Sequence, residues 1–433
     1  MAERPRRPSA PQGAETPGVA PRRAALRILD AVLRRGLPLE SALGAATSDL
    51  PNPSDRALAR SLASHTLRWL PDLDALIDGA TPRPLPPDAK PRFVLRIALA
   101  GWLRLGTPPH AAVATALPLV DGGPRRLVHG VLGALTRRGA ALPAHPSLPE
   151  PVAARWRRAW GEEAVAAAGR LIADAPLLDL ALRDPAETAR WAETLGGVSL
   201  APGHVRLASV SDLTALPGYA EGAWWVQDLA ASIPHRLLGP GEGRTVLDLC
   251  AAPGGKALGL AAAGWRVLAL DASASRLARL RGNAERTGLP VEVIEADLFQ
   301  WSPPELADAV LLDAPCSATG VFRRHPEVLH RVTPGVIASQ AELQSRMLKR
   351  AAGWIRPGGC LVYASCSLEP EEGEAVLGAF LDGQPGFTPG PPRAGELPEG
   401  MTPTPEGWVR VRPGTLEEQG GADGFFIARL ERA

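Results

Sequence analysis

Two cysteines, each placed where an apolar, strand-like run ends, carry the clearest chemical signal in the sequence. Cys316 follows the run Leu311-Leu312-Asp313-Ala314-Pro315, and Cys366 follows Leu361-Val362-Tyr363-Ala364-Ser365. The chain has only 4 cysteines in 433 residues, so this shared placement is informative. A thiolate is a strong nucleophile among side chains. Two thiols at neighbouring strand ends could therefore form, and then break, one covalent bond to a substrate.

A glycine-rich loop lies upstream of both cysteines, in the string LDLCAAPGGK at Leu247–Lys256. The pattern predicts a strand, a tight turn and a helix, whose free amino-terminal N–H groups suit a polar ligand. Because Ala257 follows Lys256, the loop lacks the G-K-[ST] ending of phosphate loops, which disfavours a kinase or an ATPase. Together with the two cysteines, the loop indicates a methyltransferase that attacks a pyrimidine ring.

Acidic residues end the strands that are predicted after this loop. Asp271 ends the second strand, where a carboxylate can bind ribose hydroxyls, and Asp297 ends the third, within reach of an adenine edge. Asp313 ends the next strand. An aspartate at a strand end is commonly only a cap. Three of them in register with the loop predict a nucleotide-type cofactor site.

The elements that must position these residues alternate regularly after residue 243. Strands are expected at 244–250, 265–271, 291–297, 308–313 and 360–365, and helices at 256–263, 273–287 and 334–354. Near-continuous apolar strands are typical of a parallel sheet covered on both faces. Residues 408–412 and 424–430 are predicted to form a terminal antiparallel pair. We therefore expect an α/β, doubly wound domain with ligands beyond the carboxyl ends of its strands.

The region before this domain has a different pattern. Residues 21–139 show helical periodicity, with Leu26, Leu29 and Val32 on one side of the first helix and Arg23, Arg27 and Arg34 on another. We expect a disordered tail at 1–20, an all-α domain at 21–140, a linker and small mixed subdomain at 141–235, and the catalytic domain at 236–433.

The charge distribution separates the same regions. Residues 1–140 hold 20 Lys+Arg and 11 Asp+Glu, a net charge of +9, whereas the remainder is 47 − 20 = 27 against 46 − 11 = 35, a net of −8. This asymmetry suggests a polyanion-binding amino-terminal module, with a chance split as an equal alternative. The arginine face of the first helix is likewise either a binding face or an ordinary solvated face.

Composition also excludes several classes of protein. No apolar run approaches the roughly 20 residues of a membrane helix, and the start of the chain lacks the apolar core of a signal peptide. We therefore expect a cytoplasmic protein without a membrane segment. The cysteines form no CxxC pair and are not near metal-spaced histidines, so we expect free thiols, no disulfide framework and no metal site.

Four strings together resemble one family. LDLCAAPGGK (Leu247–Lys256), DAPCSATGVFRRHPE (Asp313–Glu327), YASCSLEPEE (Tyr363–Glu372) and DGFFIARL (Asp423–Leu430) are similar to the motifs of the Sun/RsmB group of RNA cytosine-C5 methyltransferases. The resemblance spans the predicted catalytic domain. The helical region before it resembles the NusB-type RNA-binding bundle.

The resemblance implies a role for each matching residue. Cys366 would be the nucleophile that adds to C6 of a cytosine, and Cys316 would help to release the product. Asp313 would hold or protonate the N3/N4 edge, and Lys256 would orient Asp313 or the base. The cofactor, S-adenosyl-L-methionine, would contact the following residues: Cys250, Ala251, Ala252, Pro253, Gly254, Gly255, Lys256, Asp271, Asp297 and Asp313.

The resemblance also implies a substrate and leaves alternatives. We expect a monomer that methylates a cytidine in 16S ribosomal RNA; transfer RNA, 23S ribosomal RNA or a non-catalytic role in ribosome assembly are the alternatives. Two further runs have two interpretations each. Arg323-Arg324-His325-Pro326 is either an RNA phosphate contact or a solvated charge run. The run from Trp224 to Asp228 either borders the cofactor site or is a buried aromatic pair. Cys250 and Cys360 are expected to serve packing.

Overall fold

The computed structural model describes residues 16–208, 210 and 212–433. These residues form two compact units, which divide between Ser147 and Leu148. Most of the predicted disordered tail at 1–20 lies outside the described residues, and the first helix begins at Val19. The predicted divisions at residues 20, 140 and 235 stay predictions.

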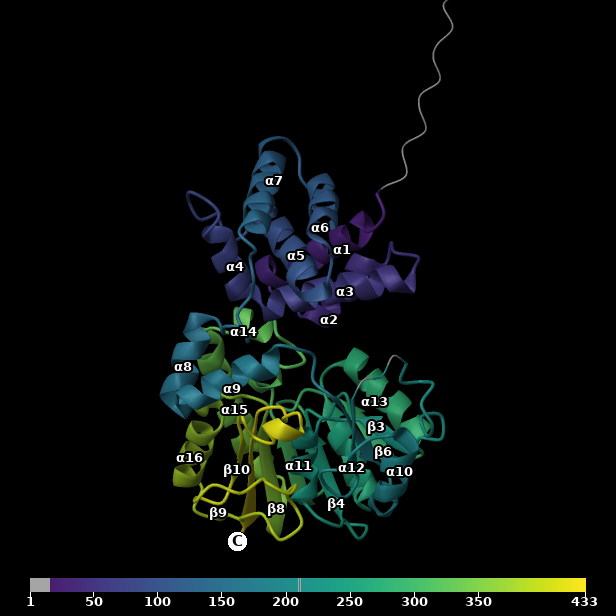
Figure 1. Ribbon diagram of the computed structural model, residues 1–433. Coiled ribbons are helices and arrows are strands. Elements are labelled where there is room, and N and C mark those ends of the chain that lie inside the picture. The colour runs from purple at the N-terminus through teal and green to yellow at the C-terminus, as the bar shows by residue number, and fades with distance from the viewer. Residues whose placement is uncertain (1–15, 209, 211) are drawn as a thin grey trace, which may run out of the picture. The chain divides into compact units, whose positions relative to one another are not determined.

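The first unit is helical, as predicted (Figure 1). Its elements are α1 (Val19–Leu29), the π-helical turn η1 (Asp30–Arg34), α2 (Leu39–Thr47), α3 (Pro53–Arg68), α4 (Leu70–Asp78), α5 (Lys90–Leu105), α6 (Pro109–Ala116), the 3₁₀ turn η2 (Leu117–Leu119) and α7 (Gly122–Arg137).

Helix α5 forms the centre of this unit because it is apolar on nearly every side. Phe93, Leu95 and Leu99 are buried in it, and α5 packs against α1, α3, α4, α6 and α7. Two of its arginines are also buried: Arg92 and Arg96 each donate from Nε to Asp74 of α4, over 3.1 and 2.7 Å. The positive charges of these two arginines are therefore paired with a carboxylate inside the bundle.

The first helix buries the apolar side that its periodicity predicts. Leu29 and Val32 are buried, whereas Arg27 and Arg34 are exposed. Each exposed guanidinium has an acidic neighbour: Arg27 contacts Asp49 at 3.0 Å, and Arg34 contacts Asp30 at 2.6 Å. This arginine face is therefore exposed to solvent, and acidic neighbours balance part of its positive charge.

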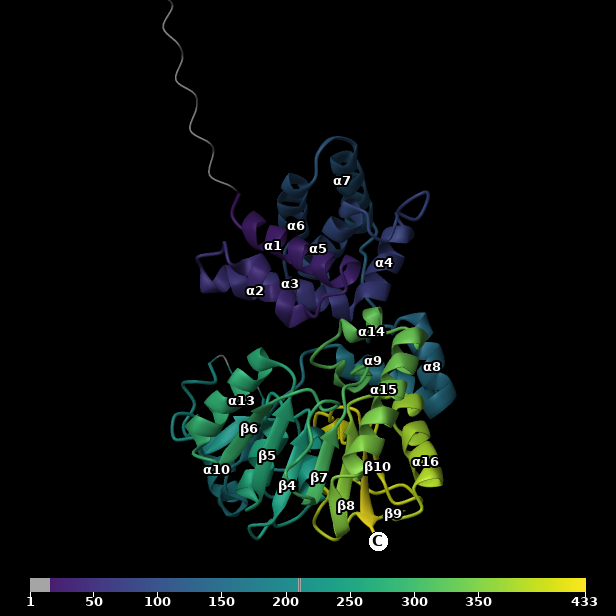
Figure 2. The ribbon, with the colours of Figure 1, turned by 180° about the vertical axis from the view of Figure 1, so that it is seen from behind.

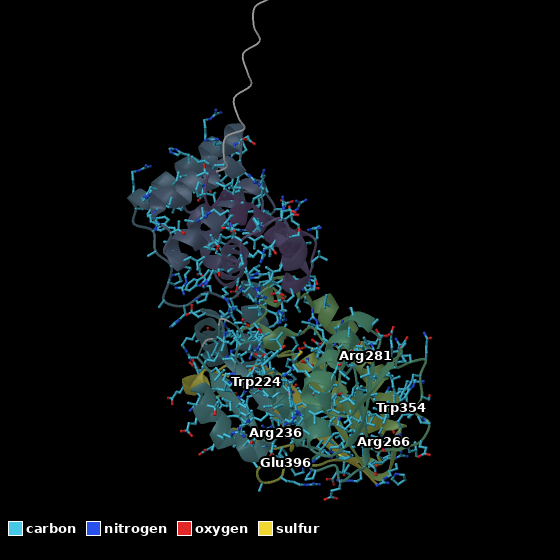
Figure 3. All side chains as sticks on the ribbon, turned by 90° about the vertical axis from the view of Figure 1, so that its right-hand side faces the viewer. Trp224, Arg236, Arg266, Arg281, Trp354 and Glu396 are labelled. Atoms are coloured by element: carbon cyan, nitrogen blue, oxygen red, sulfur yellow. The ribbon has the colours of Figure 1, made fainter. Side chains whose placement is uncertain are left out.

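The second unit opens with the segment whose sequence indicates only a mixed fold. It contains α8 (Glu150–Trp160), α9 (Glu162–Ile172), η3 (Pro185–Glu187), α10 (Thr188–Leu195), α11 (Leu229–Arg236) and the strands β1 (Leu178–Leu182), β2 (His204–Leu207) and β3 (Trp224–Val226). The strands form an antiparallel sheet in the order β2-β1-β3. Trp224, which Figure 3 labels, is buried in its core.

The main sheet follows in the predicted alternation (Figure 2). Its elements are β4 (Thr245–Leu249), α12 (Gly255–Ala262), β5 (Arg266–Asp271), α13 (Ala274–Thr287), β6 (Val291–Glu295), β7 (Ala307–Asp313), η4 (Thr319–Val321), α14 (Val328–Arg331), α15 (Pro334–Ala352), β8 (Ile355–Ser365), η5 (Pro370–Glu372), α16 (Glu374–Gly383), β9 (Phe387–Pro389), β10 (Val409–Val411), η6 (Glu417–Gln419) and β11 (Phe425–Arg432).

The strand order is β10-β11-β8-β7-β4-β5-β6, with β9 also paired to β11. Strands β4 to β8 are parallel, and β11 is antiparallel to both β8 and β10, which confirms the doubly wound fold. Strand β8 begins five residues before the predicted start at Cys360. Ile355 already pairs with Ala307, and the register then shifts so that Cys360 pairs with Ala309; Gly358, at φ +74°, lies within this irregularity.

Helices cover both faces of this sheet because successive strand residues alternate between the faces. Leu260 of α12 and Leu277 of α13 pack with Val246 and Leu311 on one face. On the other face, Leu348 of α15 and Leu377 of α16 pack with Leu247, Leu312 and Tyr363. In the part of the chain that the structure describes, no helix has the length and apolarity needed to span a bilayer.

Candidate active site

The strand order reverses at β4, which has β5 on one side and β7 on the other. Crossover connections then leave on opposite faces, and a crevice opens beyond the carboxyl ends of the strands at this switch point. Asp271 and Asp313 are the last residues of β5 and β7. Cys250 directly follows β4, and Cys366 directly follows β8. The fold therefore brings the predicted chemistry to one edge of the sheet.

The loop after β4 is shaped by backbone constraints. Cys250 adopts a left-handed conformation at φ +62°, and Gly254 has φ +111°. A Cβ on Gly254 would lie 2.7 Å from Cγ of Leu280, so the loop approaches helix α13 too closely for a side chain. Helix α12 starts at Gly255 without a side-chain cap. Its first N–H groups therefore remain available to a ligand.

Asp271 fastens this loop to the next strand. Its Oδ2 accepts from the backbone N–H of Ala252 at 3.2 Å, and its Oδ1 accepts from that of Ser273 at 2.9 Å. Asp297 is placed differently: it is exposed and accepts from the N–H of Phe299 at 2.8 Å. Both carboxylates act as local caps, and the proposed cofactor contacts of both remain predictions.

A cavity of about 270 Å³ lies beside the loop. Most of the predicted cofactor residues line it, whereas Gly254, Asp271 and Asp297 do not. Sequence reasoning missed Asp248, Ala231, Arg324 and Asp423, which line the same cavity. One signal was visible for Asp248, because a carboxylate interrupts the apolar residues of its predicted strand.

Lys256 and Asp313 meet at the wall of this cavity. Nζ of Lys256 donates to Oδ2 of Asp313 over 2.7 Å, joining the start of α12 to the end of β7. Burial by itself would lower the pKa of Lys256, but the Asp313 carboxylate outweighs that effect and raises it. Lys256 is therefore a cation at neutral pH, held against the group that the resemblance assigns to the base edge.

Among the described residues that line the cavity, Asp248 has a carboxyl without a hydrogen-bond partner. Its side chain is fully buried, and neither carboxylate oxygen has a hydrogen-bond partner. Burial raises the pKa of Asp248 to about 8, although nearby Lys256 opposes the rise, and Asp313 and Asp271 add to it. At neutral pH this carboxyl holds a proton unless a cation enters the cavity.

The two motif cysteines meet at the ends of β7 and β8. Sγ of Cys316 lies 3.3 Å from Sγ of Cys366. Gly320 sits between the two motif loops: its N–H donates to the carbonyl of Cys366 at 2.9 Å, and its own carbonyl accepts from Gly424 at 2.8 Å. The backbone thus ties the loop that carries Cys316 to the end of β8.

The environment of Cys366 controls its ionisation. The hydrogen bond with Cys316 raises the pKa of Cys366 well above its ordinary value, and burial adds to the rise. The charge of Lys256 acts in the opposite direction. Burial raises the pKa of both other thiols, Cys250 and Cys360, to about 12, in keeping with the packing role expected of them.

The Arg323–Pro326 run begins with an arginine that fits neither interpretation suggested by the sequence. Arg323 has 2% of its side chain exposed and contacts Asp423 at 3.5 Å. Arg324 donates to Asp423 at 3.1 Å and to Asp228 at 2.8 Å. The prediction of an RNA phosphate contact or a solvated charge run is therefore wrong for Arg323, because distant carboxylates from two other segments neutralise it inside the protein.

The Trp224–Asp228 run contains a buried aromatic pair, as one interpretation expected, and its later residues line the cavity; whether they border the cofactor stays a prediction. Trp224 and Trp225 are buried, whereas Gln227 and Asp228 line the cavity. A Cβ on Gly255 would lie 3.1 Å from Cδ of Gln227, so the run abuts the glycine-rich loop. Among the described residues, no group of three or more His, Cys, Asp or Glu is arranged to hold a metal ion.

Comparison with known proteins gives consistent results for both units. Residues 235–431 match a family described as 16S rRNA methyltransferase RsmB/F, and residues 19–137 match the NusB family. The ribosomal RNA small subunit methyltransferase B of Klebsiella pneumoniae is 34% identical over 94% of this chain and 96% of its own length. The protein of that name from Thermus thermophilus is 37% identical over 87% of this chain and 89% of its own.

Among solved structures, the crystal structure of PH0851 superposes with a TM-score of 0.73 and 24% sequence identity. The match covers 97% of this chain and all of the other. At this identity the likeness supports the fold.

Proposed function

The chain belongs to the RsmB/F family of 16S rRNA methyltransferases, and from this premise we propose that it methylates C5 of a cytidine in 16S ribosomal RNA, with S-adenosyl-L-methionine as the methyl donor. The observation that supports the finer chemistry best is the contact between Cys316 and Cys366, beside the Lys256–Asp313 pair. The following paragraphs derive what each residue would do.

The residues around the cavity suit this cofactor. S-adenosyl-L-methionine supplies an electrophilic methyl group on a sulfonium cation when it is bound. The cavity is lined by the carboxyls of Asp228, Asp248, Asp313 and Asp423. A cation near Asp248 would favour its ionised form, which otherwise lacks a partner. The uncapped start of α12 at Gly255 offers N–H groups to the polar ends of the molecule.

Cys366 begins the reaction on the base. The target cytosine must leave any stack to reach a site at the end of the sheet. The thiol of Cys366 passes its proton to the Asp313 carboxylate, and its sulfur bonds to C6 of the ring. The pKa of this thiol is raised by its neighbour Cys316 and lowered by Lys256. Attack is therefore favoured when Lys256 faces the sulfur and Cys316 turns away.

Asp313 receives the charge that attack creates. As the Cys366 sulfur adds, electron density moves toward N3, and the Asp313 carboxyl binds and protonates that edge. C5 becomes nucleophilic and would bond to the methyl carbon as the bond from that carbon to the sulfonium sulfur of the donor breaks, which leaves the electron pair on that sulfur and a neutral thioether as the leaving group. Lys256 holds Asp313 at 2.7 Å and compensates its charge between turnovers. Charged groups fixed in advance where charge develops contribute strongly to catalysis.

Cys316 completes the cycle. Its thiol first releases its own proton to solvent, and the thiolate then takes the proton from C5. The electron pair of the C5–H bond restores the C5–C6 double bond as the C6–S bond breaks and the sulfur leaves as the Cys366 thiolate. N3 returns its proton to Asp313, which passes it back to Cys366. The 3.3 Å separation of the two sulfurs supports this role, because a base so close to the nucleophile would act on the side of the ring where the nucleophile is attached.

We propose that the helical unit binds the RNA. Residues 19–137 match the NusB family, and the net charge of +9 over residues 1–140 suits a polyanion. We further propose that the enzyme is a monomer and acts in the cytoplasm, where ribosomal RNA is found. A cytidine in transfer RNA or in 23S ribosomal RNA could be methylated by the same reaction. The test must therefore compare different RNAs as substrates.

The test uses the purified protein, tritium-labelled methyl donor and three RNAs: 16S, 23S and bulk transfer RNA from cells that lack the gene. We expect label in 16S RNA only, and bisulfite sequencing should place it on one cytidine. Label in another RNA would move the target without changing the chemistry. A 16S transcript containing 5-fluorocytidine should become trapped on the protein. If no RNA accepts label and none is trapped, the non-catalytic assembly role is the better interpretation.

A further inference from the structure

One buried carboxylate lies beneath both cysteine loops. Glu372 ends the turn η5 and has no exposed surface. Its Oε2 accepts from the backbone N–H of Ser317 at 2.8 Å, and its Oε1 accepts from the hydroxyl of Ser367 at 2.9 Å. Ser317 directly follows Cys316, and Ser367 directly follows Cys366. The two oxygens of one side chain therefore hold the two loops one residue beyond each sulfur.

Neighbouring groups make this connection a closed network. The hydroxyls of Ser317 and Ser367 lie 3.1 Å apart. Gln344 of α15 donates from Nε2 both to Oε2 of Glu372, at 3.0 Å, and to the carbonyl of Pro315, at 2.9 Å. The hydroxyl of Tyr363 donates to the backbone carbonyl of Glu372 at 2.8 Å. Contacts with both loops and two further elements thus fix the position of the carboxylate.

The donors around Glu372 match its ionised form. An ionised carboxylate only accepts hydrogen bonds, and its three side-chain contacts come from a backbone N–H, an amide N–H and a hydroxyl. Burial raises the pKa of Glu372, and the hydrogen bonds from Ser317, Ser367 and Gln344 oppose that rise. A neutral amide in its place would direct N–H hydrogens at one of these donors, because it keeps only one acceptor oxygen.

We propose that Glu372 is a positioning residue that sets the separation of the two thiols. The inference deepens the proposed function and rests on it for the catalytic consequence, whereas the geometric claim stands on the contacts alone. Glu372 reaches neither sulfur and no cavity-lining group. It acts through the loops, because it keeps Cys316 close enough to Cys366 for both thiols to react with the same nucleobase. Small displacements of reacting groups cost about a hundredfold in rate.

The first test measures the thiol separation without RNA or cofactor. Diamide oxidises two adjacent thiols to a disulfide: the thiols lose two protons and two electrons, and the diazene becomes a hydrazine. The rate of Cys316–Cys366 disulfide formation, followed by mass spectrometry, should fall about tenfold or more in Glu372→Gln. Glu371→Gln is the matched control, because Glu371 is the exposed neighbour in the same turn, and it should oxidise at the wild-type rate.

The second test joins the geometry to the reaction. In Glu372→Gln we expect kcat to fall about tenfold or more while KM for the methyl donor stays within twofold, because the donor cavity does not include Glu372. If this variant fails to fold, Ser367→Ala removes the Oε1 contact with the loss of one oxygen atom and should show a smaller decrease in both rates.

The two tests separate the two claims. Wild-type disulfide rates in folded Glu372→Gln, or in Ser367→Ala when the first variant does not fold, would overturn the positioning role whatever the enzyme methylates. Slower disulfide formation in a protein that methylates no RNA would support the geometric role and reject the proposed function. A loss of kcat with unchanged disulfide rates would also overturn the proposal.

Discussion

Cys316 and Cys366 are 50 residues apart in the chain, yet their sulfur atoms lie 3.3 Å apart. The contact arises because β7 and β8 are adjacent parallel strands whose carboxyl ends meet at one edge. The hydrogen bond with Cys316 and burial raise the pKa of Cys366, and the charge of Lys256 opposes that rise. The first two predictions test the separate roles proposed for the two thiols.

Replacement of the nucleophile should abolish methyl transfer. Cys366→Ala removes the only sulfur assigned to attack, so we expect transfer of labelled methyl groups to fall below detection, with RNA affinity nearly unchanged. Cys360→Ala is the matched control, because Cys360 lies in β8, the strand that Cys366 follows, and burial raises the pKa of its thiol to about 12. Turnover by Cys366→Ala would remove this residue as the nucleophile.

Replacement of the second cysteine should trap the reaction midway. In Cys316→Ala the base that takes the C5 proton is missing, so a protein–RNA adduct that resists denaturant should accumulate with methyl donor present. Gel electrophoresis under denaturing conditions measures it. The double variant Cys316→Ala/Cys366→Ala should give none. An equal yield of adduct from the wild type and Cys316→Ala would contradict the release role.

Loss of the Lys256 charge should slow catalysis more than binding. Lys256→Met removes the donor that holds Asp313 at 2.7 Å and the charge that favours the Cys366 thiolate. We expect kcat to fall about 10²-fold or more, the usual effect of losing one preorganised charged donor. Lys349→Met, at an exposed position on α15, should be unaffected. Steady-state kinetics with wild-type values for both variants would exclude the role of Lys256.

Asp248 should make stability depend on pH. Its pKa rises from 3.8 when unfolded to about 8 when buried, so the folded state binds the proton more tightly. The stabilisation is fully present below the unfolded pKa and is lost as pH rises toward 8, at up to about 1.4 kcal/mol per pH unit.

Urea unfolding at several pH values measures this effect. Asp248→Asn should lose the part of the slope that belongs to Asp248, so the stability of the wild type relative to this variant should decrease between pH 5 and pH 7. Asp382→Asn, an exposed carboxyl on α16, should follow the wild type at every pH. Parallel curves for the wild type and Asp248→Asn would show that the carboxyl is ionised in the folded protein.

Gly320 should tolerate no side chain. A Cβ there would lie 2.0 Å from the carbonyl oxygen of Gly424 and 2.8 Å from that of Cys366. Both are backbone atoms, so Gly320→Ala should cost about 1–3 kcal/mol of unfolding free energy and most of the activity. Gly378→Ala, inside α16 with open space around it, should be neutral or stabilising. Thermal unfolding compares the two; an unchanged melting temperature in Gly320→Ala would contradict the close approach.

The sequence by itself determined the doubly wound domain and the edge of the sheet at which its candidate site residues lie. Apolar runs that end in Asp271, Asp313 and Cys366 specify parallel strands, and parallel strands bring their carboxyl ends together whatever their order. The helical unit was likewise predictable, because the periodicity that buries Leu29 and Val32 is local. These features depend on neighbours a few residues apart.

Only the tertiary structure decided which partners the charged groups have. Arg323 is buried against Asp423, 100 residues away, and Glu372 binds Ser317 across 55 residues. The same is true of Asp248, whose raised pKa follows from complete burial and nearby carboxyls. A charged residue in a sequence does not indicate which distant segment will cover it, because its desolvation and its ion pairs depend on long-range packing.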